Sequence, residues 1–298
     1  MVGHVKTARS SAITPLVIFS HGNSFPSGTY SMVLRGLKSA GYAVACVDKF
    51  GHDPSYPVTS NWPHLVQQLA DFIAMQEKSH EGPVYLVGHS LGGILSLMCA
   101  ARYPSIGGRE LAGVVLLDSP VLSGWKARTL QVLKKTPLLE RVSPGRISRQ
   151  RRQRWPSRDA ALEHFQGKRA FAQWHPQALA DYIAHGTHEE VGSDGSVHCV
   201  LSFDREVETA IYNTLPHNLD RLLRRHPLRC PVGFIGGTFS REMKQVGLET
   251  TRRIIGVHHE QRMQFIEGGH LFPMEKPRET AAAIVALLKR LSNSAGAG

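Results

Sequence analysis

The segment PVYLVGHSLGGILSLMCAARYP, Pro83–Pro104, decides the fold. Its first part is a short apolar run ending at Gly88, which predicts a buried strand, and its second part predicts a buried helix that begins at Gly93. Ser90 lies in the turn between them, inside the pattern Gly-His-Ser-Leu-Gly. A serine on such a tight turn projects its hydroxyl from the sheet edge, and the glycines on either side avoid collisions with the backbone. The segment therefore predicts a nucleophile elbow with Ser90 as the nucleophile.

The alternation of strand and helix patterns continues along much of the chain. Buried strands are predicted at 15–20, 43–48, 83–88, 113–118 and 231–236, with a weaker one at 262–268. Helices are predicted at 30–40, 62–76, 93–103, 241–255 and 277–291. Such alternation is typical of a parallel sheet that is flanked by helices. The sequence predicts an α/β fold with a mostly parallel, doubly wound sheet.

Two more segments extend the pattern of the elbow. LVIFSHGNSFPSGTY (16–30) is a strand followed by a His-Gly turn, and FIEGGHLFPMEKPRETAAAIVALL (265–288) is a strand, a Gly-x-His loop, a proline and a closing helix. With the elbow, these motifs resemble the α/β-hydrolase superfamily over about 15–119 and 230–291. The resemblance implies that His270 is the general base and that the backbone N–H groups of Asn23 and Leu91 hold the oxyanion. Because the fourteen residues before Pro15 leave little room for the family's first hairpin, we expect one short strand there or none.

The catalytic acid departs from the usual pattern. The family commonly places it after the strand in CPVGFIGGTFSREMKQVG (230–247), but no carboxylate appears there until Glu242. We predict Asp118 instead, at the end of the preceding strand, as in many haloalkane dehalogenases. Those enzymes attack with an aspartate, so Ser90 argues against their chemistry. Glu242, and the absence of any acid, are the alternatives.

A long interval, 121–227, interrupts the alternation with polar, basic and helical material. It is too long for a loop. We therefore expect a mainly helical cap at 121–227, inserted into a core formed by 1–120 and 228–298. This interval, called the inserted segment below, holds Trp125, Trp155, Trp174 and other aromatic residues, most of which we assign to the core of the cap.

The charge of the chain is unevenly distributed. The net charge is +11, and residues 126–169 carry 13 Lys and Arg residues against three acids. The densest part is Arg146–Arg158, which we interpret as a solvated face; a weak contact with an anionic surface is the alternative, and no recognisable nucleic-acid module accompanies it. The chain shows no signal peptide or apolar membrane span, and its four cysteines form no CxxC pair. We expect reduced thiols and a cytoplasmic protein, whose oligomeric state the sequence does not indicate.

These features together predict a serine hydrolase of carboxylic esters that uses Ser90, His270 and Asp118 and needs no cofactor or metal. The expected partner is a small ester or lactone. Lactone hydrolysis, thioester hydrolysis and carbon–carbon bond hydrolysis are alternatives on the same triad. A hydrolase-fold receptor, which binds a small molecule without repeated turnover, is the alternative from another class.

Overall fold

The computed structural model describes residues 13–122, 124, 129, 148–256 and 258–295. The expectations that concern the chain before residue 13, Trp125 and the start of the basic stretch at 146–147 lie outside the described residues.

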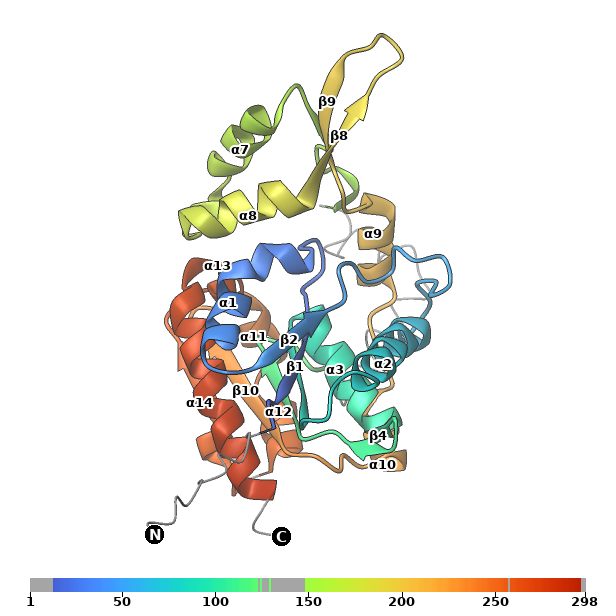
Figure 1. The fold of residues 1–298 in the computed structure, drawn as a ribbon, viewed down its shortest axis with the longest axis vertical. Helices are drawn as coiled ribbons and strands as arrows, with labels where there is room; N and C mark the ends of the chain where they lie inside the picture. The colour runs from blue at the N-terminus through green and yellow to red at the C-terminus, as the bar shows by residue number, and fades with distance from the viewer. Residues whose placement is uncertain (1–12, 123, 125–128, 130–147, 257, 296–298) are drawn as a thin grey trace, which may run out of the picture.

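Six parallel strands form the central sheet, in the order β11-β10-β6-β3-β1-β2 (Figure 1). They are β1 (Leu16–Ser20), β2 (Ala43–Cys46), β3 (Val84–His89), β6 (Gly113–Leu117), β10 (Val232–Gly237) and β11 (Met263–Ile266). Each matches a predicted strand to within one or two residues at either end. The predicted parallel, doubly wound sheet is confirmed.

Both faces of this sheet are buried, which explains why its strands are apolar without interruption. Along β1, Leu16 and Ile18 belong to one apolar core, whereas Val17 and Phe19 belong to the other. Successive side chains of a strand point to opposite faces, so each strand contributes to two cores.

Helices cover the sheet on both sides. Residues of α2 (Pro63–Glu77), α3 (Leu91–Arg102), α10 (Leu219–Arg225) and α12 (Glu249–Ile255) enter the first core. Those of α1 (Ser31–Ser39) and α14 (Pro277–Ala295) enter the second. The remaining short elements outside the inserted segment are β4 (Ser105–Ile106), β5 (Arg109–Glu110), α11 (Arg241–Val246), α13 (Phe272–Glu275), and the 3₁₀ helices η1 (Ser27–Tyr30) and η3 (Glu260–Arg262).

The single helix predicted at 241–255 is wrong. The chain forms α11 and α12 there, with a break between them. Gly247, the residue after α11, has a φ of 82°, a left-handed conformation that ends a helix. The helix predicted from Gly93 also begins two residues earlier, directly after Ser90.

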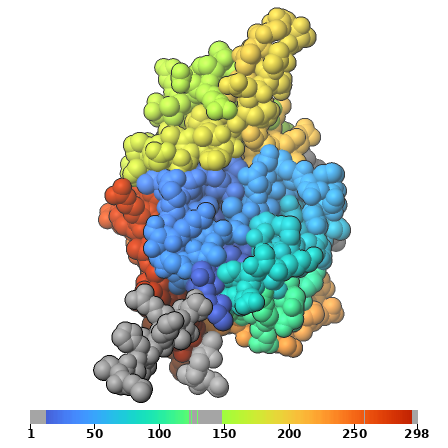
Figure 2. Space-filling view, viewed as in Figure 1, coloured from blue at the N-terminus to red at the C-terminus, as the bar shows by residue number. Residues whose placement is uncertain are grey.

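The described part of the inserted segment forms its own layer. It contains α7 (Arg158–Gln166), η2 (Arg169–Phe171), α8 (Pro176–Gly186), α9 (Arg205–Asn213) and an antiparallel sheet of β7 (Arg154–Trp155), β9 (Val197–Leu201) and β8 (Thr187–Val191). Figures 1 and 2 show α7, α8 and the β8–β9 hairpin on top of the core in this view. Because α8 packs against η1, which follows β1, this layer lies at the end of the sheet where the strands terminate. By contrast, α10 packs against α3 of the core.

An aromatic cluster holds the upper layer together. Neighbouring rings of this cluster lie 4.6–5.8 Å apart, and its members are Trp155, Phe165, Phe171, Trp174 and Tyr182. Phe25, which follows the His-Gly turn of the core, contacts the rings of Trp174 and Tyr182. The described aromatic residues of the inserted segment therefore pack mainly on one another, as expected for a small core.

The basic segment Arg146–Arg158 was interpreted as a solvated face, and its described residues are solvated only in part. Arg154 and Arg158 have side chains that are about half exposed. Arg151 is largely buried and pairs with Glu208 of α9. Within the described residues, no helix combines the length and the apolar character that a membrane span requires.

Candidate active site

The turn between β3 and α3 has the strained geometry expected for a nucleophile elbow. Ser90 has a φ of 52°, which residues other than glycine rarely adopt. A Cβ at Gly92 would lie 2.1 Å from the carbonyl oxygen of Ser20, and one at Gly88 would lie 2.3 Å from the backbone of Gly92. Glycine is therefore required at both positions, because the backbone of Gly88 contacts that of Gly92, and Gly92 contacts the end of β1.

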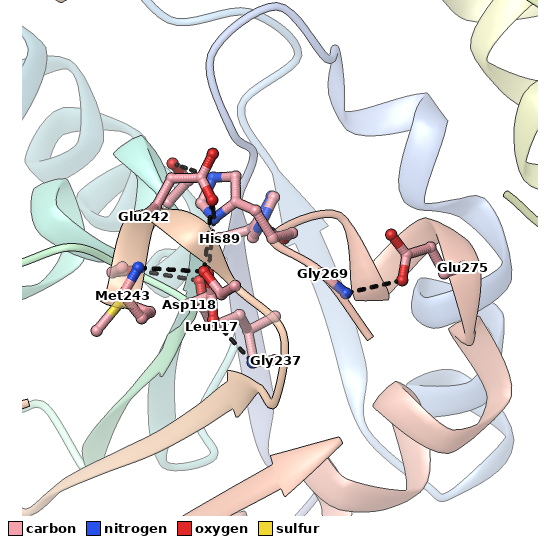
Figure 3. Close-up of polar contacts among 12 residues, drawn as sticks. His89, Leu117, Asp118, Gly237, Glu242, Met243, Gly269 and Glu275 are labelled. Carbon is pink, nitrogen blue, oxygen red and sulfur yellow. Dashed lines mark hydrogen bonds and ion pairs between the residues drawn. The ribbon is translucent and has the colours of Figure 1, made fainter. Parts of the chain in front are cut away.

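His270 lies on the loop after β11 and faces the elbow. Its Nε2 is 3.0 Å from Ser90 Oγ. The preceding residue, Gly269, donates its N–H to the carboxylate of Glu275 at 3.0 Å, a contact visible in Figure 3. This contact orients the loop that carries the imidazole.

Asp118, at the end of β6, contacts the other nitrogen of the same ring. Its Oδ2 is 2.7 Å from His270 Nδ1, and the residue is fully buried. Its Oδ1 accepts a hydrogen bond from the N–H of Gly237 at 2.8 Å, and Oδ2 accepts one from Ser240 Oγ at 2.5 Å. A carboxylate that accepts hydrogen bonds from three donors is held rigidly.

Ser240 explains the missing carboxylate after β10. The chain places a hydroxyl where an acid was expected, and this hydroxyl donates to Asp118. The loop after β10 therefore holds in place a carboxylate that follows β6.

Glu242, the alternative acid, lies farther from the ring. Its Oε2 is 4.0 Å from His270 Nδ1, beyond hydrogen-bond distance, and its side chain is 46% exposed. Its Oε2 lies 3.4 Å from Ser240 Oγ, as a longer second acceptor for the hydroxyl that donates to Asp118. Figure 3 shows Glu242 beside Asp118, approaching from α11.

The side chains of Asp118, Glu242 and His270 are the one group in the described part of the chain that could hold a metal ion. Their ligand atoms lie within 4.8 Å of one another. Asp118 is already surrounded by hydrogen-bond donors, and His270 Nδ1 is one of them. This arrangement is that of a hydrogen-bonded carboxylate, and the absence of a metal requirement stays a prediction.

The protonation of His270 is set by opposing effects. Burial alone lowers the pKa of His270, but the hydrogen bond and charge of Asp118, with the charges of Glu242 and Glu275, raise this pKa above its ordinary value. The imidazolium form is thus stabilised by nearby carboxylates, which suits a group that must take up a proton during a reaction.

The predicted oxyanion donors lie at the two turns next to Ser90. Asn23 follows the His-Gly turn after β1, the strand paired with β3, and Leu91 is the first residue of α3. Among the residues that the structure describes, neither backbone N–H donates to a backbone carbonyl oxygen of a turn, loop or helix cap. His21 holds the first turn in place: burial lowers its pKa to about 4, and its neutral Nε2 accepts a hydrogen bond from the N–H of Phe50 at 2.9 Å.

No role was assigned to His89 from the sequence, but this residue lies within the site. Its Nε2 donates to the carbonyl oxygen of His270 at 2.9 Å, so its Nδ1 accepts from the hydroxyl of Tyr30 at 2.7 Å. Tyr30 in turn accepts the N–H of Gly22 at 3.0 Å. Burial, followed by the charge of His270, lowers the pKa of His89 well below its ordinary value, so the ring stays neutral. This bridge joins the His-Gly turn, the elbow and the loop of His270; the position of His89 beside Ser90 was the available signal.

Comparison with known proteins agrees with this architecture. Residues 17–283 match the profile of the family described as "Alpha/beta hydrolase family". The monoglyceride lipase of Rattus norvegicus is 32% identical over 140 residues, which are 44% of this chain and 45% of the lipase. The chain thus aligns with less than half the length of this curated relative.

Solved structures resemble the chain over nearly its whole length. E-2-(acetamidomethylene)succinate hydrolase superposes with a TM-score of 0.64 and 21% identity, covering 93% of this chain and 92% of that one. A thioesterase domain from the curacin biosynthetic pathway gives a TM-score of 0.63 and 17% identity, covering 93% and 91%. At such low identity these similarities concern the fold.

Proposed function

The chain belongs to the α/β-hydrolase family, and from this premise we propose that it is a serine hydrolase of carboxylic esters. The observation that carries the proposal is the continuous contact from Ser90 through His270 to Asp118, with distances of 3.0 and 2.7 Å. A hydroxyl, an imidazole and a buried carboxylate in this order form the arrangement that serine hydrolases use.

In the proposed reaction, His270 Nε2 takes the proton of Ser90 as Oγ attacks the ester carbonyl. The backbone N–H groups of Asn23 and Leu91 stabilise the oxyanion, each by about 3 kcal/mol in comparable enzymes. His270 then gives the proton to the leaving alcohol, and an acyl-enzyme remains on Ser90. Water, activated by the same imidazole, attacks this ester, and Ser90 is regenerated. Asp118 keeps the Nδ1 proton in place and stabilises the imidazolium.

One observation supports an apolar acyl group. The aligned relatives are monoglyceride lipases, so esters of monoacylglycerol type are the first substrates to test.

We assign substrate selection to the inserted segment, 121–227, as a cap. Its α8 packs on η1, close to the His-Gly turn, and Phe25 of that turn enters the aromatic cluster of the segment. An element at this end of the sheet lies where the active sites of open α/β sheets are found.

The proposal predicts repeated turnover of simple esters by the purified chain. A series of p-nitrophenyl esters of increasing acyl length, a monoacylglycerol, a lactone and an acyl thioester should be compared by kcat/KM. We expect many turnovers per protein molecule, with the oxygen esters preferred. Stoichiometric release of one product per chain, without further turnover, would instead favour the receptor function.

The pH profile tests the charge environment of His270. Glu242→Gln is expected to move the acid limb of kcat/KM to lower pH, because neutral His270 is the base and the Glu242 carboxylate raises its pKa. Without that charge the ring stays neutral further into the acid range. Since Glu242 is 46% exposed, the shift should shrink in high salt. A shift toward higher pH, or identical profiles at low salt, would contradict this role.

A further inference from the structure

A buried polar contact joins the turn of Asn23 to the inserted segment. The side-chain amide of Asn23 donates to the backbone carbonyl oxygen of Glu208 at 3.1 Å. The hydroxyl of the next residue, Ser24, donates to the Glu208 carboxylate. Glu208 lies on α9 and is 3% exposed, and Asn23 and Ser24 are each 6% exposed. Two consecutive residues after the His-Gly turn are thus held by α9, on which Tyr212 also hydrogen-bonds both of their side chains.

The charge of Glu208 is balanced inside the protein. Arg151 places its guanidinium 3.2 Å from the carboxylate, and the two side chains are 17% and 5% exposed. Arg151 also donates to the hydroxyl of Tyr182 on α8 and lies over the ring of Phe165. A buried carboxylate needs such a partner, because an unpaired charge away from water is strongly unfavourable.

The residue that Glu208 contacts is conformationally strained. Ser24 has a φ of 76°, in the left-handed region that favours glycine. Residues with side chains keep such a conformation where their surroundings impose it. The contacts from α9 supply the constraint, and they act on the residue that directly follows Asn23.

α9 is itself firmly placed on the core. Ile211 of α9 is 1% exposed and belongs to the same apolar core as α2 and α3. A Cβ at Gly51, after β2, would lie 3.1 Å from Val207 Cγ1 and 3.5 Å from Ile211 Cδ1, so the helix packs tightly on that loop. A helix anchored in this way can hold the orientation of a neighbouring peptide.

We propose that Glu208 is a positioning residue for the oxyanion hole, which keeps Ser24 in its left-handed conformation and thereby aims the N–H of Asn23. The inference rests on the proposed function, since it takes the Asn23 N–H as an oxyanion donor. Through this contact the inserted segment acts on transition-state stabilisation as well as on substrate selection.

Two substitutions at Ser24 separate positioning from simple stabilisation. Ser24→Ala and Ser24→Gly both remove the hydroxyl and leave the Glu208–Arg151 pair intact. Glycine adopts the left-handed conformation without strain, whereas alanine does not. We expect Ser24→Ala to lower kcat on a p-nitrophenyl ester by about 10- to 100-fold, the range for a displaced oxyanion donor, with KM changed little. Ser24→Gly should retain several-fold more kcat than Ser24→Ala.

Glu208→Gln and a matched control complete the test. Glu208→Gln should lower kcat more than it raises KM, and it should slow labelling of Ser90 by a fluorophosphonate. Glu190→Gln, which breaks an exposed ion pair with Arg154 in the same segment, should leave both unchanged. The melting temperature is measured for every variant, so that a loss of folded protein is recognised.

The outcomes distinguish this inference from the proposed function. Equal kcat for Ser24→Ala and Ser24→Gly, or loss of activity only in proportion to loss of folded protein, would overturn the role of Glu208 while leaving the hydrolase intact. A wild-type chain that neither turns over esters nor reacts with the fluorophosphonate would instead overturn the proposed function.

Discussion

Ser90→Ala is expected to lower kcat for ester hydrolysis by about 10⁶-fold, as loss of the nucleophile does in a comparable triad. The reason is that no other described hydroxyl is placed within hydrogen-bond distance of His270 Nε2. Labelling by a fluorophosphonate probe should disappear at the same time, because the probe reacts with the activated serine. Turnover of p-nitrophenyl esters and labelling of the pure protein measure both effects.

Ser96→Ala is the matched control for this substitution. Ser96 lies on the same helix, α3, is fully buried, and donates its hydroxyl to the carbonyl oxygen of Gly92 at 2.8 Å. The Ser96→Ala protein should keep the esterase activity and the fluorophosphonate labelling of the wild type. The melting temperature of Ser90→Ala should match that of the wild-type protein, because alanine and serine are similarly strained at a φ of 52°. Full labelling of the Ser90→Ala protein would show that another residue is the nucleophile.

The features of the fold that the sequence predicted correctly are those with a local cause, and the site residues were proposed from the same local signals. Strands buried on both faces are short apolar runs, so all six could be located. The elbow is marked by glycines that the tight turn requires at Gly88 and Gly92. Asp118 could be proposed because it ends a strand that pairs with β3, which leads into Ser90.

The features that were missed depend on contacts between distant parts of the chain. Tyr30 and His89 are 59 residues apart, and Arg151 and Glu208 are 57 apart. Nothing in the local pattern of Arg146–Arg158 distinguishes the buried Arg151 from its exposed neighbours, since the distinction comes from α8 and α9 packing around it. The break at Gly247 was missed for a different reason: a glycine within a helical pattern is a weak signal until its φ is known.

Asp118→Asn should have the second largest effect, a loss of about 10⁴-fold in kcat, as in a comparable triad. The expected cause is the wrong tautomer of His270. In the wild-type chain the N–H of Gly237 donates to Asp118 Oδ1 at 2.8 Å. The side-chain oxygen of asparagine can still accept this hydrogen bond. The amide nitrogen then faces His270 Nδ1 and donates to it. His270 would carry its proton on Nε2 and could not accept the proton of Ser90.

Glu242→Gln is the companion variant, and it should change kcat at the pH optimum by less than about tenfold. Glu242 lies 4.0 Å from His270 Nδ1 on an exposed helix, so it contributes charge without fixing the tautomer. The Asp118→Asn/Glu242→Gln protein should be no more than several-fold less active than Asp118→Asn. The ring proton can be followed directly by the downfield proton NMR signal of His270 Nδ1–H, which should be lost in Asp118→Asn and kept in Glu242→Gln. If Asp118→Asn stays nearly fully active while Glu242→Gln loses its activity, the acid is supplied by α11, and the short contact between Asp118 and His270 serves the structure alone.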